Sequence, residues 1–175
     1  QNEQDSRFYG KFALLPIFEP SSQQEAYDMT RAAFELSEAV KLPVLMRVTT
    51  RMAHSRAVVN LTDEPRKQNE ISRPEDVRRW ILLPAFAKKR YVELLAQQDD
   101  LQKASVESKY NFYRKGTAPE RGVICTGIAY NYYMENCANC GERSVLKVSQ
   151  YPLPVALIEQ MVADGAKELL VMEEG

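Results

Sequence analysis

The sequence has little of what several common kinds of site require. It contains one histidine, three cysteines and one tryptophan in 175 residues. With a single histidine, no Ser–His–Asp triad can be argued from the residue pattern. An odd number of cysteines makes a poor disulfide framework and suits reduced thiols in a cytoplasm better than secreted cross-links. We therefore expect a cytoplasmic protein with free cysteines.

Long hydrophobic runs and an excess of one charge are also missing. No apolar run approaches the roughly 20 residues that a membrane span needs, and Gln1–Asp5 lacks the plan of a signal peptide. The 23 basic and 24 acidic side chains leave a formal net charge of -1, so no overall field attracts nucleic acid or an anionic membrane. These absences predict a soluble chain with neither kind of partner.

What is present predicts a βαβ unit over residues 11–51. Residues 12–18 form an apolar run that predicts a strand. Ser22 and Glu25 then have the spacing of a helix capping box, and the apolar residues that follow recur on one helical face. Residues 44–50 are a near-continuous β-prone run, which is typical of a strand buried on both faces of a parallel sheet.

The rest of the chain predicts a second α/β lobe. A polar stretch over residues 57–80 has no core periodicity and indicates a linker, and residues 85–109 predict a long helix. The last third alternates between predicted strands and helices, namely strands at 122–127, 144–148 and 168–172 and helices at 128–135 and 154–162. This alternation favours a parallel sheet with right-handed crossovers.

Ligands in such sheets bind beyond the carboxyl ends of the strands, and the loop after residues 44–50 is the first candidate there. It holds Arg51, the single histidine His54 and Ser55. His54 is suited to exchange protons or to hydrogen-bond across a lobe interface. The alternative is a loop histidine that ties the linker to the sheet.

Two further candidates come later in the chain. Cys137 and Cys140 form a C-x-x-C pair, which suits half of a zinc site or a redox dithiol. Because nothing completes a metal site, adventitious thiols in a helix-to-strand turn are favoured. Residues 125–127 end a predicted strand and open a helix whose N–H groups suit an anion, although G-x-G-x-x-G and G-x-x-x-x-G-K-[ST] are both absent.

Several runs of residues, in this order and at this spacing, resemble one enzyme family over essentially the whole chain. The family is the alpha subunit of indolepyruvate:ferredoxin oxidoreductase, which is related to the pyruvate:ferredoxin oxidoreductases. Residues 57–80 match least. The runs that carry the resemblance are Gln1–Tyr9, Glu19–Ser21, Gln24–Met29, Ala33–Glu38, Pro43–Arg47, Thr49–Arg51, His54–Arg56, Gly127–Tyr130, Ser144–Lys147, Tyr151–Pro154 and Val171–Gly175.

The resemblance implies an internal segment of a longer α/β protein. Residues 1–60 would form the C-terminal part of a thiamine pyrimidine-binding domain, a βαβ remnant of its parallel sheet. Residues 61–80 would be a linker. Residues 81–175 would form, in whole or in part, a three-layer α/β lobe like the transketolase C-terminal domain.

The resemblance also implies an activity for the complete enzyme. Indolepyruvate, an aryl 2-oxo acid, is decarboxylated on thiamine diphosphate, coenzyme A captures the acyl group, and [4Fe-4S] clusters pass electrons to ferredoxin. The partner is the beta subunit. The family's activating glutamate, its diphosphate and Mg²⁺ site and its cluster cysteines would all lie outside this segment, so we expect the segment alone to be inactive and to bind no cofactor or metal.

The βαβ unit at 11–51 would lack the earlier strands of its sheet, so it must pack on the second lobe, pair with another copy or fray. Of these we expect a homodimer or exchanged assembly, built mainly through residues 11–51.

The resemblance places the first residues beside the thiamine and substrate pocket. These are Asn2, Glu3, Gln4, Asp5 and Arg7. Arg7 is the candidate for binding the substrate carboxylate, because a guanidinium matches a carboxylate with two parallel hydrogen bonds, and Lys11 is the alternative. The competing hypothesis for the whole chain is a non-catalytic α/β interaction or regulatory module.

Overall fold

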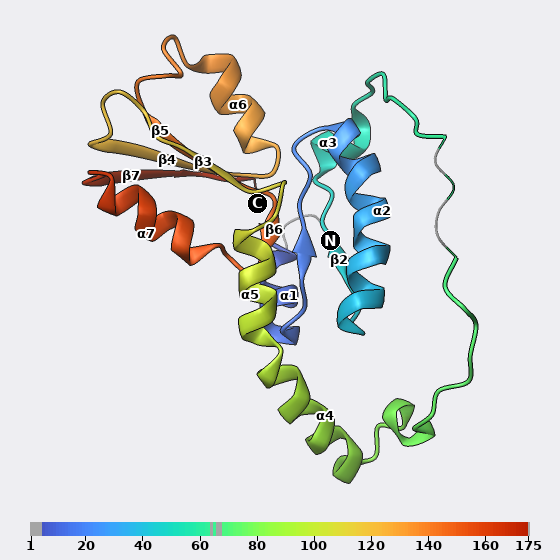
Figure 1. Ribbon diagram of the computed structural model, residues 1–175. Coiled ribbons are helices and arrows are strands. Elements are labelled where there is room, and N and C mark those ends of the chain that lie inside the picture. Colours follow the sequence, from blue (N-terminus) through green and yellow to red (C-terminus); the bar gives the residue numbers. More distant parts are fainter. Residues whose placement is uncertain (1–4, 64, 66–67, 175) are drawn as a thin grey trace.

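The computed structural model describes residues 5–63, 65 and 68–174 and confirms an α/β fold with parallel strands (Figure 1). The helices are α1 (Arg7–Ala13), α2 (Gln23–Val40), α3 (Thr50–His54), the 3-10 helix η1 (Val77–Trp80), α4 (Pro84–Ala96), α5 (Gln98–Val106), α6 (Ala129–Asn136) and α7 (Val155–Ala163). The strands are β1 (Ile17–Phe18), β2 (Leu45–Met46), β3 (Phe112–Arg114), β4 (Arg121–Thr126), β5 (Ser144–Val148), β6 (Gln150–Tyr151) and β7 (Glu168–Met172). Among the described residues, no helix is long and apolar enough to cross a membrane.

The first lobe, residues 5–55, has a small sheet in the order β2-β1-β6. Strand β1 is parallel to β2 and antiparallel to β6. Helix α2 begins as its capping residues predict, because the Ser22 hydroxyl accepts the N–H of Glu25 at 3.2 Å. Its apolar face packs on β1 through Met29, which is fully buried beside Phe18. The predicted β–α–β order is therefore confirmed.

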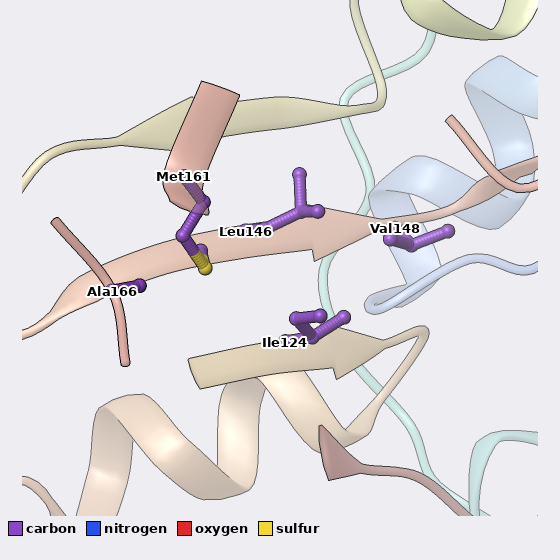
Figure 2. Close-up of a cluster of buried hydrophobic side chains, with 5 residues drawn as sticks. All are labelled: Ile124, Leu146, Val148, Met161 and Ala166. Atoms are coloured by element: carbon purple, nitrogen blue, oxygen red, sulfur yellow. The ribbon is translucent and has the colours of Figure 1, made fainter. Parts of the chain in front are cut away.

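The second lobe has three layers around a sheet in the order β3-β5-β4-β7. Strand β4 is parallel to both β5 and β7, and β3 is antiparallel to β5. Alternate residues of the central strands face opposite helices. Met161 of α7 packs on one face in the cluster of Ile124, Leu146, Val148 and Ala166 (Figure 2). Tyr133 of α6 packs on the other face against Val123, Cys125 and Val145.

One continuous segment joins the two sheets, because β5 of the second sheet runs through Ser149 into β6 of the first. Buried Asn111 holds this crossover. Its side-chain oxygen accepts the N–H groups of Ser149 and Gln150 at 2.6 and 2.9 Å, and its amide donates to the Gln150 carbonyl at 2.8 Å. Asn111 thus provides hydrogen-bond partners for main-chain groups at the point where the chain passes from the second sheet to the first.

The two strands predicted in the first lobe are much shorter than expected. Only Ile17–Phe18 is strand within 12–18, because the chain before it forms α1, which Leu14 ends in a left-handed conformation. The predicted strand 44–50 stops at Met46. Three residues later, Thr49 caps α3, because its hydroxyl accepts the Met52 N–H. Strand β2 is half-buried and not covered on both faces.

The second lobe follows its predicted order more closely. The helix expected over 85–109 is divided into α4 and α5 at Gln97. The expected strands and helices after residue 120 are all present within one or two residues. Two short antiparallel strands, β3 and β6, were not predicted. The predicted linker is exposed over most of its described length, and Figure 1 shows it looping away from both sheets.

Candidate functional site

Charged and hydroxyl side chains from both lobes meet where the strands of the two sheets end. Glu19 follows β1, Arg47 follows β2, and Glu173 follows β7. Parallel strands bring their carboxyl ends to one edge, the usual place for ligand-binding groups. We call this group the interlobe polar cluster; its members are Asp5, Arg7, Glu19, Arg47, Thr126, Tyr151 and Glu173.

A buried ion pair between Glu19 and Arg47 lies at its centre. The Arg47 Nη1 donates to Glu19 Oε1, and Glu19 is only 1% exposed. The Tyr151 hydroxyl donates to Glu19 Oε2 at 2.9 Å, while Arg47 Nη2 donates to the Glu174 carbonyl at 2.6 Å. Burial raises the pKa of Glu19, and the charge of Arg47 and the Tyr151 hydrogen bond act against this rise.

Gly127 allows the turn after β4 to lie against Glu19. It has a φ of +47°, and a Cβ added there would lie 2.6 Å from Glu19 Cγ. A side chain at this position would therefore be strained and would collide with Glu19. The turn at 125–127, expected to suit an anion, is thus packed against a carboxylate of this chain.

Arg7 is held by acidic groups on two sides. Its Nε and Nη2 donate to the Asp5 carboxylate at 2.7 to 3.0 Å, and its Nη1 donates to Thr126 Oγ1 at 3.0 Å and pairs with Glu173 at 2.9 Å. Burial opposes the charged form of Arg7, but the hydrogen bonds to Asp5, together with Tyr151 and the charge of Glu19, outweigh it and raise the Arg7 pKa. The same bonds lower the pKa of Asp5 against the effect of its burial. The Glu173 side chain is the most exposed of these carboxylate partners, at 54%.

A second ion pair joins the lobes on the α6 side of the second sheet. Lys147, in the middle of β5, pairs with Glu25 of α2, and its side chain is only 4% exposed. Its ammonium lies 5.4 Å from the ring centre of Tyr130 and 6.0 Å from that of Phe112. Aromatic faces and a carboxylate both stabilise a buried cation. The two lobes are therefore held together by charge as well as by β6.

The other residues predicted for the site lie outside the interlobe polar cluster. Arg51 reaches the second lobe, with its guanidinium 5.4 Å from the ring centre of Tyr132. Ser55 accepts a hydrogen bond from Gln23 within the first lobe, and His54 and Lys11 are exposed. Asn2, Glu3 and Gln4 lie outside the described residues.

Glu19, Arg47 and Tyr151 were not among the residues predicted for the site. Glu19 carries a usable signal, because it is the first charged residue after the apolar run at 12–18 that predicts a strand, and the rule that ligands lie beyond strand ends would have selected it. Arg47 lies inside the predicted strand 44–50, so the same rule would have passed over it. Tyr151 has no comparable signal, since it belongs to β6, a two-residue strand.

The expectation of three free cysteines is wrong for two of them. Cys137 and Cys140 form a disulfide, with Cα atoms 5.3 Å apart, because the turn after α6 brings them within bonding range. Cys125 is free, and burial raises its thiol pKa to about 11.

The comparison with known families identifies the chain. The pyruvate flavodoxin/ferredoxin oxidoreductase, thiamine diphosphate-binding family matches residues 5–135. The chain belongs to this family. All members of the interlobe polar cluster except Tyr151 and Glu173 fall within the matched residues.

Curated relatives match almost all of this chain and are much longer. The "Indolepyruvate oxidoreductase subunit IorA" of Methanothermobacter thermautotrophicus is 39% identical over 177 residues, and that of Archaeoglobus fulgidus is 40% identical over 179. The protein of the same name from Thermococcus kodakarensis is 35% identical over 182 residues. In each case the match covers 99% of this chain and 28% of the relative.

Thiamine diphosphate, the cofactor in this family's description, would need groups for its diphosphate and for a metal ion. Within residues 5–63, 65 and 68–174, no group of three or more His, Cys, Asp or Glu side chains is placed to hold a metal ion. The guanidinium groups of Arg7 and Arg47 are both paired with carboxylates of this chain. The interlobe polar cluster therefore does not fit a diphosphate.

Proposed function

We propose that the chain is part of the alpha subunit of an enzyme that oxidatively decarboxylates indolepyruvate, or a related aryl 2-oxo acid, with thiamine diphosphate. The observation that carries the proposal is the 35 to 40% identity, over 99% of the chain, to the three subunits named indolepyruvate oxidoreductase. The proposal includes Mg²⁺, [4Fe-4S] clusters, coenzyme A, ferredoxin, a beta subunit and a cytoplasmic location.

The domain assignment is part of the same proposal. Residues 1–60 would complete a pyrimidine-binding domain, 61–80 would be a linker, and 81–175 would belong to a lobe like the transketolase C-terminal domain. The exposed linker and the three layers around the second sheet support this division. The continuous path from β5 into β6 means that the two lobes act as one support for the loop at Asp5–Arg7.

Within the complete enzyme, Arg7 is our candidate for binding the 2-oxo acid carboxylate. Asp5 orients the guanidinium through Nε and Nη2, and Thr126 fixes Nη1. The exposed Glu173 carboxylate on Nη1 has the same charge and shape as the carboxylate of a 2-oxo acid. We propose that the substrate displaces Glu173 from this position, since the glutamate side chain of this pair is 54% exposed and can turn into solvent.

The remaining predicted residues receive supporting roles in this proposal. Arg51 would hold α3 against the second lobe through Tyr132. His54 and Ser55 would shape the loop beside it, and Asn2, Glu3 and Gln4 would precede Asp5 at the edge of the pocket.

The activity is tested with the complete enzyme. Alpha and beta subunits purified together should reduce ferredoxin when indolepyruvate, coenzyme A and thiamine diphosphate with Mg²⁺ are present, and omission of any one should abolish the reduction. Pyruvate is the matched control for the aryl group. Ferredoxin reduction by pyruvate but by no aryl 2-oxo acid would contradict the proposed substrate class.

We predict that the 175-residue chain by itself binds thiamine diphosphate only weakly. The groups expected to hold the diphosphate and Mg²⁺ lie elsewhere in the subunit, so calorimetric titration with both should give a dissociation constant above about 0.1 mM, or a binding free energy weaker than about -5.5 kcal/mol. The complete enzyme is the positive control. Tighter binding by the chain would show that the cofactor site lies within it.

We also predict that the isolated chain self-associates through residues 11–51. Strand β2 is the outer strand of its sheet, and Phe12 of α1 is 91% exposed. Pairing about a two-fold axis would cover both the strand edge and this ring. Light scattering over a dilution series should show a dimer that dissociates on dilution. A monomer at all concentrations with slow hydrogen exchange in residues 11–51 would show that the first lobe needs no partner.

A further inference from the structure

The turn that follows α6 contains a feature that the proposed function does not use. Cys137, the residue that ends α6, is joined by a disulfide to Cys140. Both cysteines are half-buried, and the two residues between them are exposed. Loop-closure entropy increases with loop length, so a bridge between positions only three apart stabilises the fold less than one that closes a long loop. This disulfide is therefore accessible and contributes little as a structural cross-link.

A cavity beside this turn is lined in part by Cys137. It has a volume of about 380 Å³, within the range that small-molecule pockets occupy, and it lies between the end of α6 and the outer strand β7. Its lining includes Tyr133, Asn136, Cys137, Asn139, Leu170 and Met172. Cys140 is not part of that lining. A small reagent in the cavity therefore meets Cys137 first.

Main-chain carbonyl groups near the two sulfur atoms could accept hydrogen bonds from the reduced thiols. The Met134 carbonyl lies 3.6 Å from Cys137 Sγ and 3.8 Å from Cys140 Sγ, and the Cys137 carbonyl lies 3.4 Å from Cys140 Sγ. A disulfide sulfur carries no proton, so only thiols can donate to these carbonyls. Met134 lies in the last turn of α6, where carbonyl groups lack helical partners. Arg114 Nη2 donates to the Cys140 carbonyl at 2.6 Å and anchors that residue's main chain.

We propose that Cys137 and Cys140 form a reversible thiol–disulfide couple that a small external dithiol reduces through this cavity. A thiolate of the dithiol attacks Cys137 Sγ, the Cys137–Cys140 bond breaks, and Cys140 leaves as a thiolate that takes up a proton. The second thiolate of the dithiol then attacks the first dithiol sulfur, the one bonded to Cys137. The bond to Cys137 breaks, and Cys137 leaves as a thiolate that is also protonated. Two electrons pass to the protein and the dithiol becomes a cyclic disulfide.

The first experiment uses native protein that has been oxidised with glutathione disulfide. After treatment with millimolar dithiothreitol and then iodoacetamide, mass spectrometry should find two alkyl groups, on Cys137 and Cys140, and none on buried Cys125. If the reduced protein is treated again with glutathione disulfide before alkylation, neither cysteine should be alkylated. Failure of native protein to be reduced, with reduction only after unfolding, would overturn the proposal. So would two alkyl groups on the oxidised protein without any reductant.

The second experiment identifies the attacked sulfur with matched variants. Cys140→Ser leaves Cys137 as the free thiol, and Cys137→Ser leaves Cys140. Under native conditions, the first should react with dithiobis(nitrobenzoic acid) at least about tenfold faster than the second, because thiol exchange depends on access to the sulfur. Equal rates, or a faster reaction of Cys137→Ser, would overturn attack at Cys137. The native-protein titration does not depend on how either variant folds.

Discussion

Replacing Arg47 by methionine should destabilise the protein by about 3 to 5 kcal/mol, because removing one partner of a buried ion pair leaves the other charge uncompensated. Glu19 is 1% exposed, and among the described residues it would keep only the Tyr151 hydroxyl as a side-chain donor. Methionine preserves much of the volume of the arginine stem, so the loss reports on charge more than on packing. Urea unfolding followed by circular dichroism measures the change.

The matched control is the double variant Arg47→Met with Glu19→Gln. Glutamine still accepts from Tyr151 but carries no charge, so the double variant should recover a substantial part of the lost stability. Equal losses in the single and double variants would show that the unpaired charge of Glu19 is not what destabilises Arg47→Met.

The pH dependence of the Arg47→Met effect has a definite sign. Burial already raises the pKa of Glu19, and losing Arg47 raises it further. A group with a raised folded-state pKa stabilises the fold at low pH and loses that contribution as the pH rises through this pKa. The destabilisation should therefore be smaller near pH 5 than near pH 8. A larger loss at the lower pH would mean that Glu19 is not the group left unpaired.

The second large effect concerns catalysis. In the complete enzyme, Arg7→Ala should lower kcat/KM for the 2-oxo acid by about tenfold or more, because a hydrogen bond to a charged group is worth roughly 1.5 to 3 kcal/mol. Arg7→Lys should recover only part of this, since an ammonium cannot reproduce the paired hydrogen bonds to Asp5. Steady-state ferredoxin reduction with varied indolepyruvate provides the measurement.

Two variants separate this role from a purely structural one. Lys11→Ala removes an exposed cation of α1 and should leave kcat/KM unchanged. Glu173→Gln removes the carboxylate that occupies Arg7 Nη1 and should lower KM for the 2-oxo acid. A larger loss in Lys11→Ala would move the substrate contact to that residue. An unchanged KM in Glu173→Gln would contradict the proposal that the substrate displaces Glu173 from Arg7.

The second lobe was largely predictable because its strands and helices are set by local pattern. Strands β4 and β5 are apolar runs covered on both faces, and α6 and α7 follow each strand in the order that a parallel sheet requires. The first lobe was less predictable. Its apolar run at 12–18 divides into a helix and a two-residue strand at Leu14, whose left-handed conformation has no marker in the sequence.

The candidate site was predictable only in its position relative to the strands. Arg7 was selected through the family resemblance. Glu19 and Arg47 follow two strands of the first sheet, and their position beside Thr126 and Glu173, at the ends of β4 and β7, could be known only if both sheets end at the same place. That convergence depends on β6 pairing with β1, a contact between distant parts of the chain. Periodicity within a short window cannot report such a pairing.

The pairing of β1 with β6 also sets an order for synthesis on the ribosome. Ile17 has Tyr151 as its antiparallel partner, so the first sheet gains its third strand only after the about 133 residues between them have been made. Until then one edge of β1 in the first lobe stays unpaired, and unpaired strand edges favour aggregation. Closing so large a loop is slow because the loss of chain entropy precedes the formation of the contacts. We therefore expect nascent chains to depend on chaperones until residue 151 has left the exit tunnel.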